Sequence, residues 1–228
     1  MKKISLFMLA VIAGLGLFAQ DNHRLVTTMS TAPHFGIKAS VNLAELKISG
    51  QPSGSATNTE NRTSFSAGFL YSLPLGTMFR LQPELVYSGQ GSKLSQTATV
   101  LGNTYNSTAD LKLNYVNLPV MLQWQTPAGF FVELGPQIGY LTSAKQIATG
   151  SNTNSSNETD VKNQMRKMDW GAAGGIGYLS RVGLGIGARY YYGMRNIYDT
   201  ENQNNANSGE AKNRVISIGL QWQFGAGK

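Results

Sequence analysis

The sequence predicts an all-β protein, an eight-stranded antiparallel up-and-down transmembrane β-barrel. Apolar residues recur at every second position in eight segments, which is the period of a strand with one apolar face. The connections between these segments are alternately short and long. Only 14% of the 228 residues are charged, against about 25% in an average soluble domain, and 26 residues are glycine. These features together are typical of barrels that cross an outer membrane.

The N-terminus has the pattern of a secretory signal peptide. Two lysines follow Met1, and an apolar run over residues 4–18 comes next. That run is too short to span a bilayer comfortably. We therefore expect a signal peptide over residues 1–19, cleaved near Ala19 and Gln20, and a periplasmic linker over residues 20–33. A retained N-terminal anchor helix is the alternative.

The eight expected strands lie within residues 34–224, and residues 225–228 form a C-terminal extension. Their ranges are 34–43, 64–73, 78–88, 111–124, 130–140, 168–178, 184–192 and 216–224. In the fourth strand the apolar positions change from Leu111, Leu113 and Tyr115 to Leu118 and every second residue after it. We expect a β-bulge near residues 116–117 to cause this change of phase.

Short connections at residues 73–76, 126–129 and 180–183 alternate with long ones near residues 45–62, 90–109, 141–166 and 194–213. Outer-membrane barrels have short periplasmic turns and long extracellular loops. Because the number of strands is even, both termini are expected on the periplasmic side. The sheet must close, since an unpaired strand edge cannot be tolerated in lipid.

The apolar face of the strands is expected to face lipid, and its aromatic residues are expected at the two membrane interfaces. This predicted girdle consists of Tyr71, Tyr87, Tyr115, Trp124, Tyr140, Trp170, Tyr178, Tyr190, Trp222 and Phe224. A soluble barrel of the lipocalin type, with its apolar face inward, is the alternative. The opposite face is rich in glycine and has few charges, which suits a narrow interior better than a soluble exterior.

The polar face predicts a network of side chains inside the barrel. Its expected members are Lys38, Arg80, Glu84, Lys112, Glu133, Gln137, Asp169 and Arg189. Unpaired buried charges are costly, so these groups are expected to form ion pairs that fill the interior. A path for a substrate or for protons through them is the alternative. Eight strands leave room only for side chains, so a wide pore is not expected.

Several segments resemble the PorT-like, porin-family outer-membrane barrels of Bacteroidota. The matching stretches are 36–42, 81–88 (LQPELVYS), 90–93, 114–119 (NYVNLP), 135–140 (GPQIGY), 183–190 and 213–224. The resemblance implies an eight-stranded barrel in the cell outer membrane. It also implies that some relatives assist protein secretion to the cell surface.

The sequence offers little material for catalysis or for cofactor binding. There is no cysteine, and the two histidines are His23 and His34. No Ser/His/acid grouping is expected to converge, and Glu133 with Asp169 would be a speculative acid pair. We therefore expect no enzyme activity, no metal site and no cofactor. The net charge of +7, or +5 without Lys2 and Lys3, is too scattered for nucleic-acid binding.

The expected role is structural, or an interaction at the cell surface through the long extracellular loops. The alternative is an accessory component of a protein secretion or translocation apparatus. The expected partners are outer-membrane lipid, the barrel assembly machinery during insertion, and a protein bound by the loops or within a secretion complex. Affinity capture from membranes separates the two roles, because only the alternative requires stoichiometric partners.

Overall fold

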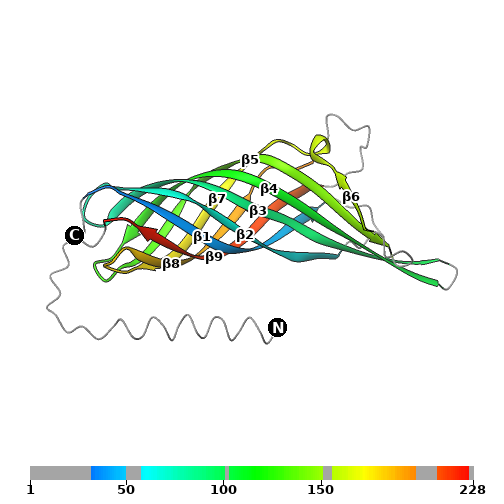
Figure 1. Ribbon diagram of the computed structural model, residues 1–228, viewed down its shortest axis with the longest axis horizontal. Helices are drawn as coiled ribbons and strands as arrows, with labels where there is room; N and C mark the ends of the chain where they lie inside the picture. The colour runs from blue at the N-terminus through cyan, green and yellow to red at the C-terminus, as the bar shows by residue number, and fades with distance from the viewer. Residues whose placement is uncertain (1–31, 50–57, 101–102, 151–155, 199–209, 226–228) are drawn as a thin grey trace.

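The computed structural model describes residues 32–49, 58–100, 103–150, 156–198 and 210–225, and most of them lie in β-strands (Figure 1). The strands are β1 (His34–Ser49), β2 (Asn58–Pro74), β3 (Phe79–Val100), β4 (Asn103–Gln125), β5 (Phe130–Gly150), β6 (Ser156–Asp160), β7 (Met168–Leu179), β8 (Leu184–Gly193) and β9 (Glu210–Gln223). A 3-10 helix, η1 (Lys162–Gln164), follows β6. Within these described ranges, no helix is long and apolar enough to cross a membrane.

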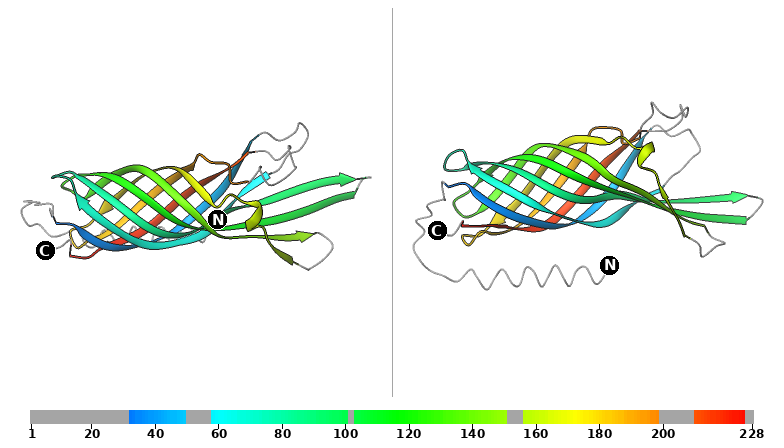
Figure 2. Two further views of the ribbon diagram at one scale, coloured as in Figure 1. Left: turned by 90° about the horizontal axis from the view of Figure 1, so that it is seen from above. Right: turned by 45° about the horizontal axis from the view of Figure 1, so that its top comes forward.

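Eight of these strands close into an antiparallel barrel, which confirms the predicted fold class (Figure 2). Each strand of the ring pairs with the strands that precede and follow it in the chain, except that β5 pairs with β7 because β6 is not part of the ring. The ring closes where β1 pairs with β9, for example Ile37 with Trp222. Strand β6 pairs only with the far end of β5 and is an addition to the ring.

Two of the short connections are the same kind of turn. Gly129 N–H donates to the Thr126 carbonyl at 2.9 Å, and Gly183 N–H donates to the Ser180 carbonyl at 3.0 Å. Both glycines have positive φ, 98° and 86°, which side chains with a Cβ rarely adopt. The sequence therefore specifies these turns locally, through a glycine as the last residue before the next strand.

The strands extend well beyond the predicted bounds at the end of the barrel that carries the long connections. Residues 90–109, expected as a loop, are mostly paired strand, and the β3–β4 register continues to Val100 opposite Asn103. Likewise β5 continues to Gly150. The physical reason is that segments of Thr, Ser and Asn can still exchange backbone hydrogen bonds when a hairpin has already started, even without an apolar face.

A belt of exposed apolar side chains surrounds the barrel. On β5 it runs from Phe130 to Tyr140, and Leu134 near its middle is 67% exposed. At roughly 3.3 Å per residue and a strand tilt of about 40°, this stretch rises roughly 25 Å. That height matches the apolar band of an outer-membrane barrel, so the exposed belt is the lipid-facing surface.

Both described ends of the chain lie at the end of the barrel with the short turns (Figure 1). The His34 ring Nδ1–H donates to the Phe224 carbonyl at 3.2 Å. The Gln223 N–H donates to the Gly183 carbonyl at 2.8 Å. The predicted signal peptide, most of the predicted linker and residues 226–228 lie outside the described residues.

Candidate functional site

The centre of the barrel interior holds a cluster of four charged side chains from four strands. The Arg189 guanidinium on β8 donates twice to the Glu84 carboxylate on β3, at 2.7 and 2.8 Å, and once to Glu133 on β5, at 2.7 Å. Lys38 on β1 donates to both Glu84 oxygens, at 2.9 and 3.1 Å. The two positive and two negative groups balance, and they tie opposite walls of the barrel together.

Two glutamines complete the hydrogen bonds of the acidic members of this ionic cluster. Gln82 donates to Glu84 at 2.8 Å, and Gln123 donates to Glu133 at 2.8 Å. Both glutamines are 2% exposed or less. The Glu84 carboxylate thus accepts hydrogen bonds from three side chains, which is the arrangement a buried charge requires. These glutamines sit on the polar face of their strands, and sequence reasoning did not single them out.

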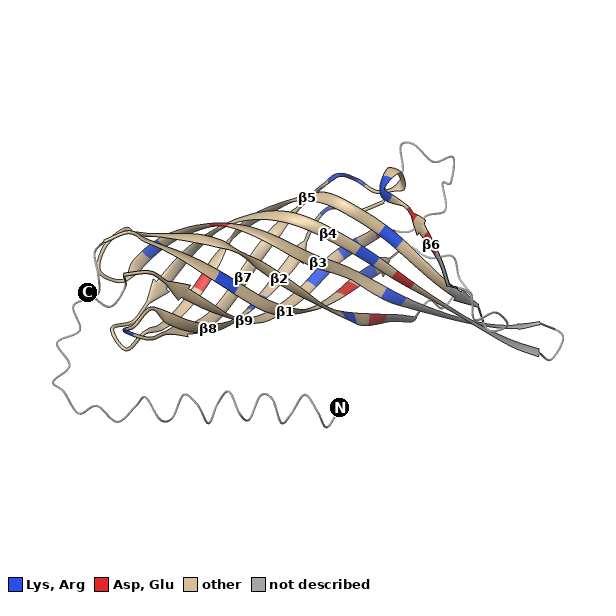
Figure 3. Cartoon of the chain, in the orientation of Figure 1, with Lys and Arg blue, Asp and Glu red and all other residues tan. Residues whose placement is uncertain are grey.

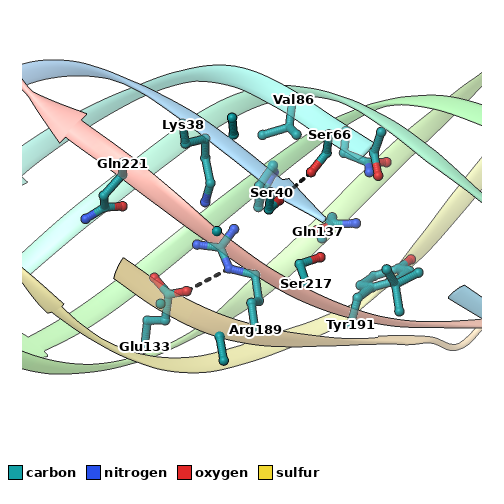
Figure 4. Close-up of a pocket in the computed structure, with 18 of the residues that line it drawn as sticks. Lys38, Ser40, Ser66, Val86, Glu133, Gln137, Arg189, Tyr191, Ser217 and Gln221 are labelled. Atoms are coloured by element: carbon teal, nitrogen blue, oxygen red, sulfur yellow. Dashed lines mark hydrogen bonds and ion pairs between the residues drawn. The ribbon is translucent and has the colours of Figure 1, made fainter. Parts of the chain in front are cut away.

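A small cavity with both polar and apolar lining residues lies beside the ionic cluster (Figure 4). Its volume is about 70 Å³, room for roughly five water molecules. Arg189, Gln137 and Tyr191 line it, together with serines of β1, β2, β3 and β9. Ser40 and Ser66, which are opposite each other on the neighbouring strands β1 and β2, are hydrogen-bonded to each other in its wall. A cavity of this volume can hold water molecules but is too small for a drug-sized ligand.

The other predicted interior residues lie in separate places. The Arg80 Nε–H donates to Ser72 Oγ at 2.7 Å, at the end with the short turns. Asp169, toward the other end, accepts a hydrogen bond from the Asn213 side chain at 2.7 Å. Glu133 and Asp169 therefore have different partners, and the sequence-based idea of an acid pair has no geometric support here.

Beyond Asp169, toward the long connections, a buried apolar cluster fills much of the interior, next to the buried polar residues Gln90 and Ser92. The buried cluster there comprises Leu46, Leu111, Leu113, Tyr115, Leu141, Ala144, Val161, Met165, Ile197 and Ala211. Every one of them is 6% exposed or less. A second buried group, including Met121, Ala173 and Tyr191, comes from β1, β4, β7, β8 and β9. We call the first group the apolar plug, because it fills much of the barrel interior at this end.

The connection around η1 covers this end of the barrel. The Val161 N–H donates to the Ala144 carbonyl, and the Arg166 N–H donates to the Ile197 carbonyl. Met165 also forms an isolated bridge with Tyr198, which follows β8. Two long connections thus meet over the barrel and contribute Val161, Met165 and Ile197 to the apolar plug. The only sequence signal for this was the presence of isolated apolar residues within polar segments.

The assignment of Tyr115 to the lipid-facing girdle is wrong. Its side chain is 1% exposed and lies in the apolar plug. The backbone of β4 keeps one phase throughout, with odd-numbered positions inward from Leu111 to Gln123. The apolar residues change face because the strand leaves the membrane: beyond that point water is outside and the apolar core is inside. The bulge in this pair of strands lies on β5 instead. Asn114 and Tyr115 of β4 pair with Ser143 and Leu141, so Thr142 of β5 is the extra residue.

The assignment of Lys112 to the barrel interior is wrong for the same reason. Lys112 occupies an even-numbered position of β4 and lies opposite Lys145, an exposed residue of β5. It therefore lies on the outer surface, beyond the lipid-facing belt. The other nine girdle residues are on the outer face of the barrel. Tyr178 is half-buried, and each of the rest is between 41% and 52% exposed.

Charged residues gather on the outer surface near the long connections (Figure 3). Arg62 and Asp110 form an ion pair at 3.1 Å, and Lys145 and Glu158 form another at 2.6 Å. The hydrogen bond from Lys145 lowers the pKa of the Glu158 carboxyl, and it raises the pKa of the Lys145 ammonium. Within the described ranges, His, Asp and Glu residues form no group of three or more that could hold a metal ion.

Comparison with known proteins identifies the type of barrel. A family model described as an outer membrane protein beta-barrel domain matches residues 18–199. No curated protein matches the chain. Among solved structures, Ail of Yersinia pestis is 13% identical with a TM-score of 0.46, covering 84% of this chain and 99% of its own.

Two further solved structures have comparable similarity. Neisserial surface protein A is 14% identical with a TM-score of 0.45, and the match covers 83% of this chain and 97% of that protein. OprG from Pseudomonas aeruginosa is 14% identical with a TM-score of 0.44, and the match covers 86% of this chain and 98% of that protein.

Proposed function

The chain belongs to the outer membrane protein beta-barrel family, and from that premise we propose that it is a closed, non-enzymatic barrel that presents its long connections at the cell surface for contact with a partner. Its termini and short turns lie on the periplasmic side. Residues 1–19 direct export, and residues 20–33 link them to the barrel. Within the family, the chain is of the PorT-like type on the residue resemblance given above.

The filled interior is the observation that carries this proposal. The ionic cluster joins β1, β3, β5 and β8 at mid-barrel, and the apolar plug occupies the end with the long connections. A diffusion pore needs a continuous polar path, which ten buried apolar side chains interrupt. The barrel wall therefore serves as a membrane-embedded support, and the working surface is outside the membrane.

The chemistry of the interior supports a non-enzymatic role. Each charged group of the ionic cluster is engaged by an opposite charge, so none is available as an activated base or nucleophile. His34 lies at the short-turn end, where its ring donates to a backbone carbonyl. Lipid analysis of a strain that expresses the protein is expected to show unchanged acyl chains and head groups. An altered lipid in the expressing strain alone would contradict this part of the proposal.

The orientation can be tested by cysteine labelling, since the natural chain has no cysteine and gives no background. Lys93→Cys places a thiol on an exposed position of β3 near the long connections. Val182→Cys, at a side chain 71% exposed in a short turn, is the matched control at the other end. We expect a membrane-impermeant maleimide to label Lys93→Cys in intact cells, and Val182→Cys only after the outer membrane is permeabilised. The reverse pattern would refute the orientation.

A further inference from the structure

The cavity beside the ionic cluster exists because four neighbouring strands place small residues side by side on their inward faces. The four residues are neighbours in the strand register, and they are Gly219 of β9, Ser40 of β1, Ser66 of β2 and Ser88 of β3. All four line the cavity. A glycine and three serines cannot fill the space that larger inward side chains occupy elsewhere in the barrel, so this row leaves the interior open.

Two buried glutamines line the cavity on opposite sides of this row, and each has a polar atom without a partner. Gln221 is two residues beyond Gly219, toward the short turns, and Gln90 is two residues beyond Ser88, toward the long connections. About four residues, or roughly 13 Å along the strands, therefore separate them. Gln90 is 2% exposed and Gln221 is 9% exposed. Among the described residues, nothing bonds the Gln221 Nε2 donor or the Gln90 Oε1 acceptor. Because buried polar atoms almost always have a hydrogen-bond partner, both atoms point to a ligand in the cavity.

The cationic side chains of the ionic cluster also line the cavity (Figure 4). The Lys38 ammonium has three N–H bonds, and within the described part of the chain its hydrogen bonds are the two to Glu84. The Arg189 guanidinium has five N–H bonds, and three of them donate to Glu84 and Glu133. The wall of the cavity therefore offers several donors and at least one acceptor, the Gln90 amide oxygen, for a ligand to bond.

We propose that the cavity binds a file of about five water molecules, which accept hydrogen bonds from Gln221 and Arg189 and donate to Gln90. At a spacing of about 2.8 Å, this file is long enough to join the two glutamines. Water suits the site because it both donates and accepts. A small anion only accepts, so it would leave Gln90 unbonded, and it would add an unbalanced buried charge to a neutral cluster, which is costly. An apolar guest would bond with none of these groups.

The water file connects β3 to β9 inside the barrel and supplies hydrogen bonds that the ionic cluster lacks. It ends beside the apolar plug, since Gln90 lies opposite Leu113 in the register of β3 and β4. The file therefore does not open a path through the barrel, and it is compatible with a closed interior. The inference goes beyond the surface role proposed above and does not depend on it.

NMR of the full chain in lipid nanodiscs tests for this water. The glutamine side-chain amides are isotope-labelled, and nuclear Overhauser effects from water to each amide are recorded. We expect cross-peaks of long-lived water at Gln90 and Gln221. Gln82 is the matched control, because it is fully buried, is bonded to Glu84 and Gln223, and does not line the cavity; it is expected to give no such cross-peak. Gln90→Met and Gln221→Met identify the two amides by the loss of their signals.

Val86→Ile tests the same site without removing a hydrogen-bonding group. Val86 lines the cavity and is 7% exposed, so the added methyl group takes up part of the cavity volume. Filling a dry cavity raises stability, whereas filling a hydrated one displaces water and leaves polar atoms unbonded. We therefore expect weaker water cross-peaks at both glutamines and a lower urea midpoint of unfolding. Val86→Ala, which enlarges the cavity, is the control and is expected to keep the cross-peaks. A heat-shifted gel band checks the folding of every variant first.

A folded protein without water cross-peaks at either glutamine would overturn the inference, and so would a Val86→Ile variant more stable than the natural protein. Loss of the cross-peaks as chloride is added, with a shift of the Gln221 amide signal and none of the Gln90 signal, would assign the cavity to an anion and would also overturn it. Cross-peaks that persist at every chloride concentration and weaken in Val86→Ile would support it. None of these results bears on the surface role, which the labelling experiment above tests separately.

Discussion

Glu84→Gln removes the central negative charge of the ionic cluster and is the sharpest perturbation of the barrel interior. The Glu84 side chain is fully buried and accepts hydrogen bonds from Lys38, Arg189 and Gln82. Without its charge, Glu133 alone opposes two cations in the cluster. Removing one partner of a buried ion pair costs about 3–5 kcal/mol, because the remaining charge is left unbalanced. We expect a decrease of this size in the free energy of unfolding.

Urea unfolding of the protein in lipid vesicles, followed by tryptophan fluorescence, measures this change. Lys38→Met added to Glu84→Gln restores the charge balance, so the double variant is expected to recover part of the lost stability. Glu158→Gln, which removes an exposed carboxylate paired with Lys145, is the control and is expected to leave the unfolding midpoint unchanged. Unaltered stability in Glu84→Gln, or a double variant less stable than the single one, would refute the reasoning.

Four further substitutions test other parts of the barrel by the same unfolding measurement. Leu134→Arg places a charge at the middle of the lipid-facing belt and is expected to cost about 2–4 kcal/mol, whereas Ile138→Arg, nearer the interface, should cost less. Equal costs would contradict the assigned depths. Leu113→Ala removes a fully buried side chain from the apolar plug and is expected to cost about 2–5 kcal/mol; no loss of stability would mean that the plug is loosely packed. Gly129→Ala forces positive φ on a residue with a Cβ that would lie 2.3 Å from the Leu179 carbonyl oxygen, and is expected to cost about 1–3 kcal/mol. Ala128→Ser in the same turn is its neutral control.

The wall of the barrel could be predicted from the sequence because its signals are local. Alternating apolar residues mark each membrane-crossing stretch, and short turns such as Thr126–Gly129 end in a glycine whose conformation the turn requires. The long polar segments gave no such signal. Their extended pairing, as in the β3–β4 hairpin, comes from continuation of a register that the apolar stretches had already established.

The arrangement of the interior could be predicted only in part, because alternation groups residues by face without saying which face is inside. Lys38, Glu84, Glu133 and Arg189 lie in stretches surrounded by lipid, where the polar face is inward. Tyr115 and Lys112 lie where β4 has left the lipid, and there the same alternation has the opposite meaning. A change of apolar face along one strand therefore marks the membrane boundary as readily as it marks a bulge.

Conductance of the purified protein in planar lipid bilayers tests the closed interior most directly. The ionic cluster and the apolar plug together predict no steady channel at any applied voltage that the bilayer withstands. The measurement is made on protein that first shows the heat-shifted band of a folded barrel. Reproducible nanosiemens steps from such protein would contradict a filled interior, and with it the proposal that the function resides at the surface connections.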